Sequence, residues 1–163
     1  MDKEKQKKKT LTISSNFKKK IDSSSLSKNE ITDADTGFLF SEFTAVYGGA
    51  NIQTQIRALN SGSQIVVGTP GRVIDLINRK KLKLKDVEFV VLDEADEMLS
   101  MGFKDDLDFI LERTRSERQT MLFSATMSKE VKSISKKYMK DAKEISVSKI
   151  NSGAKNIEHH IYS

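Results

Sequence analysis

The stretch Val90-Val91-Leu92-Asp93-Glu94-Ala95-Asp96 decides the fold class of this chain. Its first three residues are apolar and two of them are β-branched, which is typical of a strand buried inside a parallel sheet. Two carboxylates follow this strand directly. Because ligands of open α/β sheets bind where the strands end, an Asp at this place can hold Mg²⁺ on a nucleotide, and a neighbouring Glu can orient or deprotonate an attacking water.

Strand-like and helix-like segments alternate on both sides of this stretch. Helical spacing of apolar residues follows Gly48-Gly49, Pro70, Gly102 and Ser128. Strands are expected at residues 43–47, 64–67, 87–92, 119–123 and 145–147. This alternation predicts an α/β fold with a mainly parallel sheet covered by helices.

Thr69-Pro70-Gly71-Arg72 follows the second of these strands and has a clear chemistry. Thr caps the helix, Pro needs no amide donor at a helix start, and Gly permits close approach. The free N–H groups of the helix can then bind a phosphate, to which Arg72 can add a charge-assisted hydrogen bond. A plain strand-to-helix turn is the alternative interpretation.

Three other segments can each be interpreted as functional or as ordinary structural features. Gly48-Gly49 allows a sugar–phosphate strand to approach the backbone closely, or forms a simple turn. Ser124-Ala125-Thr126 places two hydroxyls after the strand at 119–123, where ordinary turn chemistry also favours them. Asp93 and Glu94 themselves could be no more than a solvated acidic helix start.

Taken together, in this order and spacing, these motifs make residues 42–150 resemble the first RecA-like domain of a DEAD-box ATP-dependent RNA helicase. Val46-Tyr47-Gly48-Gly49 and Met101-Gly102-Phe103 add to the resemblance. It implies ATP and Mg²⁺ as cofactors, and ATP hydrolysis coupled to RNA binding and unwinding. It also implies RNA as a partner that is recognised through its backbone with little sequence preference.

The resemblance also implies roles for single residues. Asp93 would hold Mg²⁺ through water, and Glu94 would act as general base. Asp96 would bond to the loop formed by Ser124, Ala125 and Thr126, and this contact would couple the nucleotide state to the RNA grip. Gly48 and Gly49, together with Thr69, Pro70, Gly71 and Arg72, would contact RNA.

The P-loop of the family is missing from this sequence. No GxxxxGK[ST] pattern occurs, and no Gly is followed by Lys. The glutamine motif that reads adenine and the PTREL-type segment are also unrecognisable. We therefore expect a partial domain whose front third is replaced or deleted, and doubtful nucleotide binding by this chain alone.

The domain expected from this pattern spans residues 37–150. Residues 1–36 are rich in Lys, Ser, Thr, Asn and Asp and are expected to be a disordered tail. Residues 151–163 resemble a linker toward a second RecA-like domain. Without the front of the domain, the strand at 87–92 should have an unpaired edge that aggregates or that a partner chain completes. Residues 38–42 could fill part of this gap.

Charge and composition limit the roles of the N-terminal tail and the cellular compartments that we expect for this chain. Residues 1–20 hold eight Lys against Asp2 and Glu4, whereas the whole chain has a net charge of +5, so the basic character belongs to the tail. Such a tail can contact phosphate, act as an import signal or only keep the chain soluble. No Cys is present, which fits a reducing compartment. No segment is apolar enough for a membrane span or a secretory signal, which leaves a nuclear, nucleolar or cytoplasmic address.

Three hypotheses follow. The first is a DEAD-box RNA helicase sequence that is inactive alone, with residues 136–140 and 157–159 leaning toward the nucleolar ribosome-biogenesis branch. The second is a non-enzymatic RNA-binding or interaction protein built on a helicase domain. The third is a misannotated fragment. His159-His160 fits a surface position better than a metal site, because no third ligand is near in the sequence.

Overall fold

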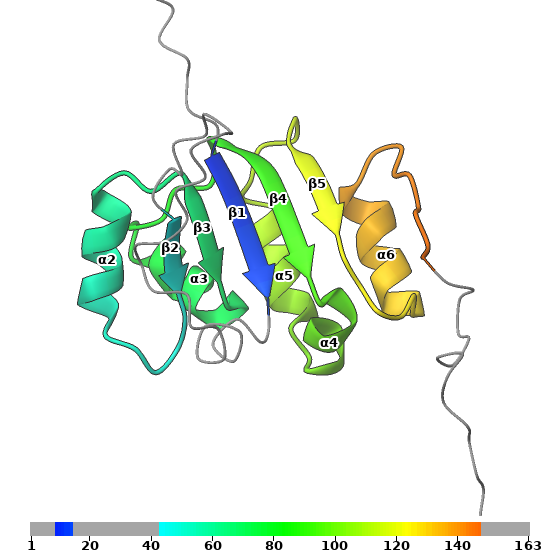
Figure 1. Cartoon of the computed structure of the whole chain (residues 1–163), viewed down its shortest axis with the longest axis horizontal. Coiled ribbons are helices and arrows are strands. Elements are labelled where there is room, and N and C mark those ends of the chain that lie inside the picture. Colours follow the sequence, from blue (N-terminus) through cyan, green and yellow to red (C-terminus); the bar gives the residue numbers. More distant parts are fainter. Residues whose placement is uncertain (1–8, 15–42, 148–163) are drawn as a thin grey trace, which may run out of the picture.

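A five-stranded parallel sheet forms the centre of the molecule in the computed structural model, which describes residues 9–14 and 43–147. The strand order is β2-β3-β1-β4-β5 (Figure 1). The strands are β1 (Lys9–Ser14), β2 (Phe43–Val46), β3 (Ile65–Gly68), β4 (Val87–Asp93) and β5 (Gln119–Leu122). The predicted α/β fold with a parallel sheet is confirmed.

From β2 to β5, helices connect consecutive strands, as parallel pairing requires, and one more helix follows β5. They are α2 (Ile52–Asn60), α3 (Pro70–Asn78), α4 (Ala95–Ser100), α5 (Lys104–Leu111) and α6 (Lys129–Tyr138). In Figure 1, α3 and α5 lie behind the sheet, whereas α2 and α6 lie beside its two edges. Asn51 caps α2 and Ser128 caps α6 through side-chain oxygens, and α6 begins directly after Ser128, where helical spacing was expected to begin.

The central strand is the main departure from the sequence prediction. Lys9–Ser14 lies inside the segment expected to be disordered, yet it pairs in parallel with β3 on one side and β4 on the other. The expectation for residues 1–36 is therefore wrong for this segment; the remainder of that range lies outside the described residues. The unpaired edge expected on β4 is also wrong, because β1 and β5 occupy its two sides.

A physical reason explains how a Lys-rich segment forms a central strand. Thr10, Leu11, Thr12 and Ile13 alternate polar and apolar side chains, and Leu11 and Ile13 are fully buried. Burial of two such aliphatic side chains contributes about 1.5–3 kcal/mol each. Because lysines precede this short alternation, the composition of the segment does not reveal it.

The register divides the sheet into two unlike faces. Leu11 and Ile13 share a face with Val90 and Leu92, and these four side chains are completely or almost completely buried in one core cluster with residues of α3 and α5. The opposite face is partly buried and largely apolar, with Ile65, Val67, Phe89, Val91 and Met121. The sheet is therefore packed mainly from one side within the described residues.

A strand expected at residues 145–147 does not form. Ile145 is 81% exposed and Val147 is fully exposed, and neither pairs with the sheet. Two apolar residues are too few to hold a strand when they have no neighbour to cover them. Residues 38–42 and 148–163 lie outside the described residues, and so do His159-His160 and the predicted linker.

Candidate functional site: the carboxyl edge of the sheet

All five strands run in the same direction, so their carboxyl ends meet at one edge of the sheet. The registers connect the last residues into one row: Val46 with Gly68, Gly68 with Ile13, Ile13 with Leu92, and Leu92 with Leu122. With about 4.8 Å between neighbouring strands, this row spans about 19 Å. Gly48-Gly49, Thr69–Arg72, Asp93-Glu94 and Ser124–Thr126 each begin one or two residues after this row.

The acidic motif begins where β4 ends. Asp93 is the last residue of β4, and Glu94 adopts a left-handed backbone conformation, with φ 55° and ψ 47°. Such a conformation costs a non-glycine residue about 1–3 kcal/mol and is found where structure around it holds it. The Ala95 N–H donates to the Phe123 carbonyl over 3.0 Å and fixes the start of α4.

β1 adds a residue to this site that sequence reasoning missed. Ser14 pairs in register with Asp93, is 1% exposed, and directs its Oγ to Glu94 Oε2 over 3.4 Å. The hydroxyl lies at the carboxyl end of β1, on the face that Thr10 and Thr12 also occupy. The sequence carried a weak signal for it, namely a serine that ends the alternating segment Thr10–Ile13.

Asp96 joins the acidic motif to the Ser124–Thr126 loop, a contact that the family resemblance implied. Its Oδ2 accepts hydrogen bonds from Thr126 N and Thr126 Oγ1, each at 2.8 Å. Ser124 Oγ donates to the Thr126 carbonyl over 2.6 Å and closes the loop on itself. Burial alone would raise the pKa of Asp96, but the bonds from Thr126 and Ser124 outweigh it and lower this pKa below its usual value.

A depression of about 440 Å³ lies over this motif. Its lining residues are Asp93, Glu94, Asp96, Glu97, Phe123, Ser124 and Ala125. The carboxylates fit a Mg²⁺ site of the kind that uses one or two protein ligands together with water and phosphate oxygens. Within the described residues no cluster of three or more His, Asp or Glu side chains could hold a metal by itself.

The sequence does not supply the residues that would hold the phosphates of a nucleotide. A P-loop holds phosphates with consecutive backbone N–H groups and a lysine after glycine, and the sequence contains no Gly-Lys pair. The residues present therefore fit the metal but not the triphosphate.

The other half of the edge holds the glycine pair and the start of α3. Gly49 has φ 80°, a conformation that glycine adopts without strain, and a Cβ on Gly48 or Gly49 would meet no atom within 4 Å. The pair therefore faces open space. α3 begins at Pro70 as predicted, but Thr69 makes no side-chain capping bond, so that detail of the prediction is wrong. The Thr69 backbone N–H instead donates to the Val46 carbonyl over 3.1 Å.

Arg72 does not extend freely from this helix. Its guanidinium donates to the Ala50 carbonyl at 3.2 and 3.3 Å and to Gln55 Oε1 at 2.8 Å. Gln55, which sequence reasoning also missed, is 6% exposed and donates in turn to the Tyr47 carbonyl over 3.1 Å. Its position three residues after Ile52 and one before Ile56 could have indicated a buried polar residue on the apolar side of α2.

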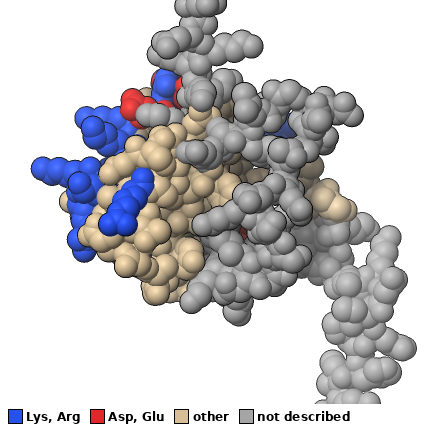
Figure 2. All heavy atoms as spheres, turned by 60° about the vertical axis from the view of Figure 1, so that its left-hand side comes forward, with Lys and Arg blue, Asp and Glu red and all other residues tan. Residues whose placement is uncertain are grey.

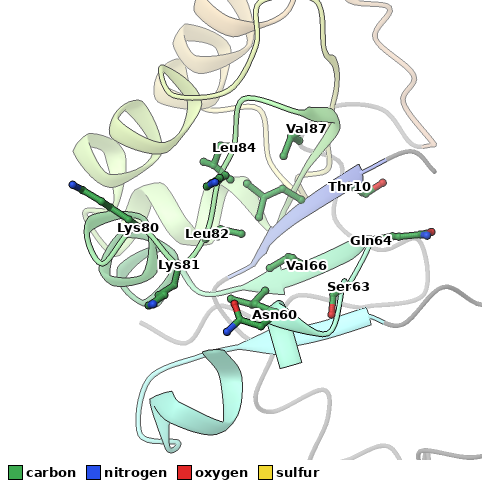
Figure 3. Close-up of a pocket in the computed structure, with 13 residues that line it drawn as sticks. Thr10, Asn60, Ser63, Gln64, Val66, Lys80, Lys81, Leu82, Leu84 and Val87 are labelled. Atoms are coloured by element: carbon green, nitrogen blue, oxygen red, sulfur yellow. The ribbon is translucent and has the colours of Figure 1, made fainter. Parts of the chain in front are cut away.

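A second cavity, of about 360 Å³, lies near the beginnings of β3 and β4, away from the carboxyl edge (Figure 3). Leu84 and Val87 contribute apolar surface, and Lys80, Lys81 and Lys83 lie on its rim. Figure 3 shows Lys80 extending away from Leu84 and Val87. The basic groups of Lys80 and Lys81 do not converge on this cavity, so the carboxyl edge is the stronger candidate site.

A parallel sheet with carboxylates at the end of one strand, hydroxyls at the end of the next and a glycine loop beside a helix start defines a partial RecA-like domain of the helicase type. The family model for the DEAD/DEAH box helicase matches residues 23–134, more than half of the chain. The chain therefore belongs to the DEAD/DEAH box helicase family.

Curated relatives share this part of the sequence at high identity. The chain is 56% identical over 117 residues to the RNA helicase CrhR of Synechocystis, a match that covers 72% of this chain and 24% of the relative. It is 51% identical over 112 residues to the DEAD-box ATP-dependent RNA helicase CshA of Bacillus subtilis, which covers 64% of this chain and 23% of that one. The chain thus spans about a quarter of these relatives. They give no support to the nucleolar branch.

Solved structures agree with the fold. A DEAD box protein from Methanococcus jannaschii superposes with a TM-score of 0.66 at 38% identity, over 84% of this chain and 36% of that one. A hypothetical ATP-dependent RNA helicase from Sulfolobus tokodaii gives a TM-score of 0.69 at 33% identity, over 83% and 39%. In the part of the chain that the structure describes, no helix has the length and apolar character of a membrane span.

Proposed function

We propose that this chain is the RNA-contacting part of the first RecA-like domain of a DEAD-box ATP-dependent RNA helicase. One observation carries the proposal: the row of strand ends aligns the predicted RNA contacts with the DEAD and Ser124–Thr126 motifs on one edge. In the complete protein this edge would couple ATP hydrolysis to RNA binding and unwinding.

On the β4–β5 half, the proposed roles follow the geometry. Asp93 would bind Mg²⁺ through water and Glu94 would be the general base, with the Ser14 hydroxyl beside it. The nucleotide state would be coupled to RNA binding at the other end of the carboxyl edge through Asp96, Ser124, Ala125 and Thr126. The two hydrogen bonds between Asp96 and Thr126 support this role.

On the β2–β3 half, RNA would lie against Gly48, Gly49 and the N-terminus of α3. Gly71 lies in this first turn, where a Cβ would meet nothing within 4 Å, so a phosphate can approach the helix amides. Figure 2 shows several Lys and Arg side chains gathered toward one side of the face in view, while most of the described surface beside them is uncharged.

This chain alone would bind RNA without hydrolysing ATP. The observation that favours this second, non-enzymatic role is the absence of a Gly-Lys pair that could hold the transferred phosphate. A protein partner is not needed to complete the sheet next to β4, since β1 already fills that place.

The test uses the full chain and fluorescently labelled single-stranded RNAs of different sequences. We expect weak binding that is similar for all sequences and that decreases steeply with salt, since backbone contacts release counterions. Phosphate release with RNA and Mg²⁺-ATP should equal the buffer background. ATP turnover that Glu94→Gln abolishes would contradict the non-enzymatic role, and a strong preference for one RNA sequence would contradict backbone recognition.

A further inference from the structure

Gln55 is a buried amide with partners at both ends. Its Nε2 donates to the Tyr47 carbonyl over 3.1 Å, and its Oε1 accepts from Arg72 Nη1 over 2.8 Å. A buried amide of a surface helix is costly unless such partners satisfy it. α2 therefore carries this residue for the contacts that it makes with the loop after β2 and with α3.

The two residues enclose the glycine pair. Gln55 binds the carbonyl of Tyr47, directly before Gly48, and Arg72 binds the carbonyl of Ala50, directly after Gly49. The pair itself contacts nothing that would restrict a side chain. Glycine backbone has more conformational freedom than any other residue, so these flanking bonds are what restricts the loop.

We propose that Gln55 and Arg72 are positioning residues that hold the Gly48-Gly49 loop against the N-terminus of α3, so that both form one preorganised surface for RNA phosphates. Arg72 acts on RNA through the loop and not as a phosphate ligand. The proposal rests on the RNA-binding function proposed above.

The geometry of the guanidinium supports this division of roles. Nη1 and Nη2 of Arg72 both donate to the Ala50 carbonyl, and Nη1 also donates to Gln55. The same edge cannot at the same time bind a phosphate in the two-bond manner that makes arginine a strong phosphate ligand. A loop held before binding loses less conformational entropy when RNA arrives.

The first experiment separates positioning from direct charge contact. Binding of a labelled single-stranded oligouridylate is measured at several salt concentrations for the full chain and for Gln55→Met and Arg72→Lys. We expect each variant to bind about 3–10-fold more weakly with the slope of log K against log salt unchanged, because each variant keeps its charge and the number of ion contacts with phosphate stays the same. The double variant should bind no more weakly than either single one.

Matched controls are Gln53→Met and Arg57→Lys, which make the same changes at exposed positions of α2; both should bind like the parent chain. For Arg72, the variant Arg72→Met removes the charge. If it lowers the salt slope by about 0.7, the value for one phosphate contact to a single strand, and Arg72→Lys binds like the parent chain, Arg72 is a phosphate ligand and the proposal is wrong.

A second experiment needs no RNA. Amide hydrogen exchange of Gly48, Gly49 and Ala50 should be about tenfold faster in Gln55→Met and Arg72→Lys than in the parent chain, while exchange in β4 stays unchanged. Unchanged loop exchange would overturn the positioning role. Absence of RNA binding by the parent chain would instead overturn the proposed function, and the exchange result would still decide the role of the two residues.

Discussion

The two halves of the carboxyl edge are organised by different chemistry. On the β4–β5 half, a carboxylate holds the loop: Asp96 accepts two hydrogen bonds from Thr126. On the β2–β3 half, the loop is held by a guanidinium and a neutral amide, those of Arg72 and Gln55. The first arrangement depends on an ionised acid, whereas the second contains no group that titrates below neutral pH. Acid should therefore loosen one half before the other.

β1 lies between these halves. It pairs with β3, which leads into α3, and with β4, which carries the acidic motif. Any coupling between the two halves through the sheet must cross this strand. Its loss should thus affect both halves together, whereas local changes should affect only one.

The largest effect is expected from Ile13→Ala. Ile13 is completely buried and lies in register with Gly68 on one side and Leu92 on the other. A cavity at this position should lower the free energy of unfolding by about 2–5 kcal/mol, and urea unfolding measures it. Thr12→Ala, on the partly buried face of the same strand, should cost less than about 1 kcal/mol. Equal effects of the two substitutions would show that β1 is not packed in the sheet.

A smaller effect, confined to the β2–β3 half, is expected from Gly68→Ala. An added Cβ would lie 2.5 Å from Val46 Cγ2 and 2.6 Å from Val73 Cγ2. Such overpacking costs about 1–3 kcal/mol, which thermal or urea unfolding would detect. Gly71→Ala is the control, because a Cβ there has open space. If both variants unfold like the parent chain, β2 and α3 do not enclose Gly68 as closely as described.

A third effect concerns the contact between α5 and α6, next to the β4–β5 half of the carboxyl edge. Asp108 on α5 accepts hydrogen bonds from Tyr138, from Lys137 at 3.1 Å and from Lys104 at 3.0 Å, and so ties α6 to α5. Burial alone would raise the pKa of Asp108, but these bonds lower it to about 2. Asp108→Asn should lower the free energy of unfolding at neutral pH by about 1–2 kcal/mol.

The pH dependence of this contribution has a definite sign. Because the pKa of Asp108 in the folded chain is lower than its ordinary value of 3.8, its stabilisation is complete above that value and is lost as the pH decreases through about 2. The difference in unfolding free energy between the parent chain and Asp108→Asn should therefore shrink on acidification over this range. A difference that grows toward low pH would contradict the assignment.

The sequence predicted the strands on both sides of the centre better than the central strand itself. Val90–Leu92 and Ile65–Val67 are continuous apolar segments followed by turn residues, so their strands and the positions of Asp93 and Thr69 at the strand ends were correctly expected. β1 was missed because its two buried residues, Leu11 and Ile13, are embedded among lysines and become informative only when β3 and β4 pair with them. The contacts of Ser14 and Gln55 were missed for the same reason, since their partners lie on other elements.

The smallest effect tests whether the two halves of the carboxyl edge respond to acid separately. Thr126→Val keeps the backbone N–H bond to Asp96 and removes the hydroxyl bond. The site is open to solvent, so the free energy of unfolding should change by less than about 1 kcal/mol.

The pKa of Asp96, which lies below 3.8 in the parent chain, should move upward toward that value in Thr126→Val, and NMR titration of this carboxyl measures the change. Because a lowered pKa means that ionisation stabilises the loop above about 3.8 and that this is lost on acidification, the loop should loosen at a higher pH in the variant. Over the same range, amide exchange of Gly48 and Gly49, corrected for its intrinsic pH dependence, should stay constant. If those glycines loosen together with Thr126, the two halves respond to acid as one unit and the distinction between them is wrong.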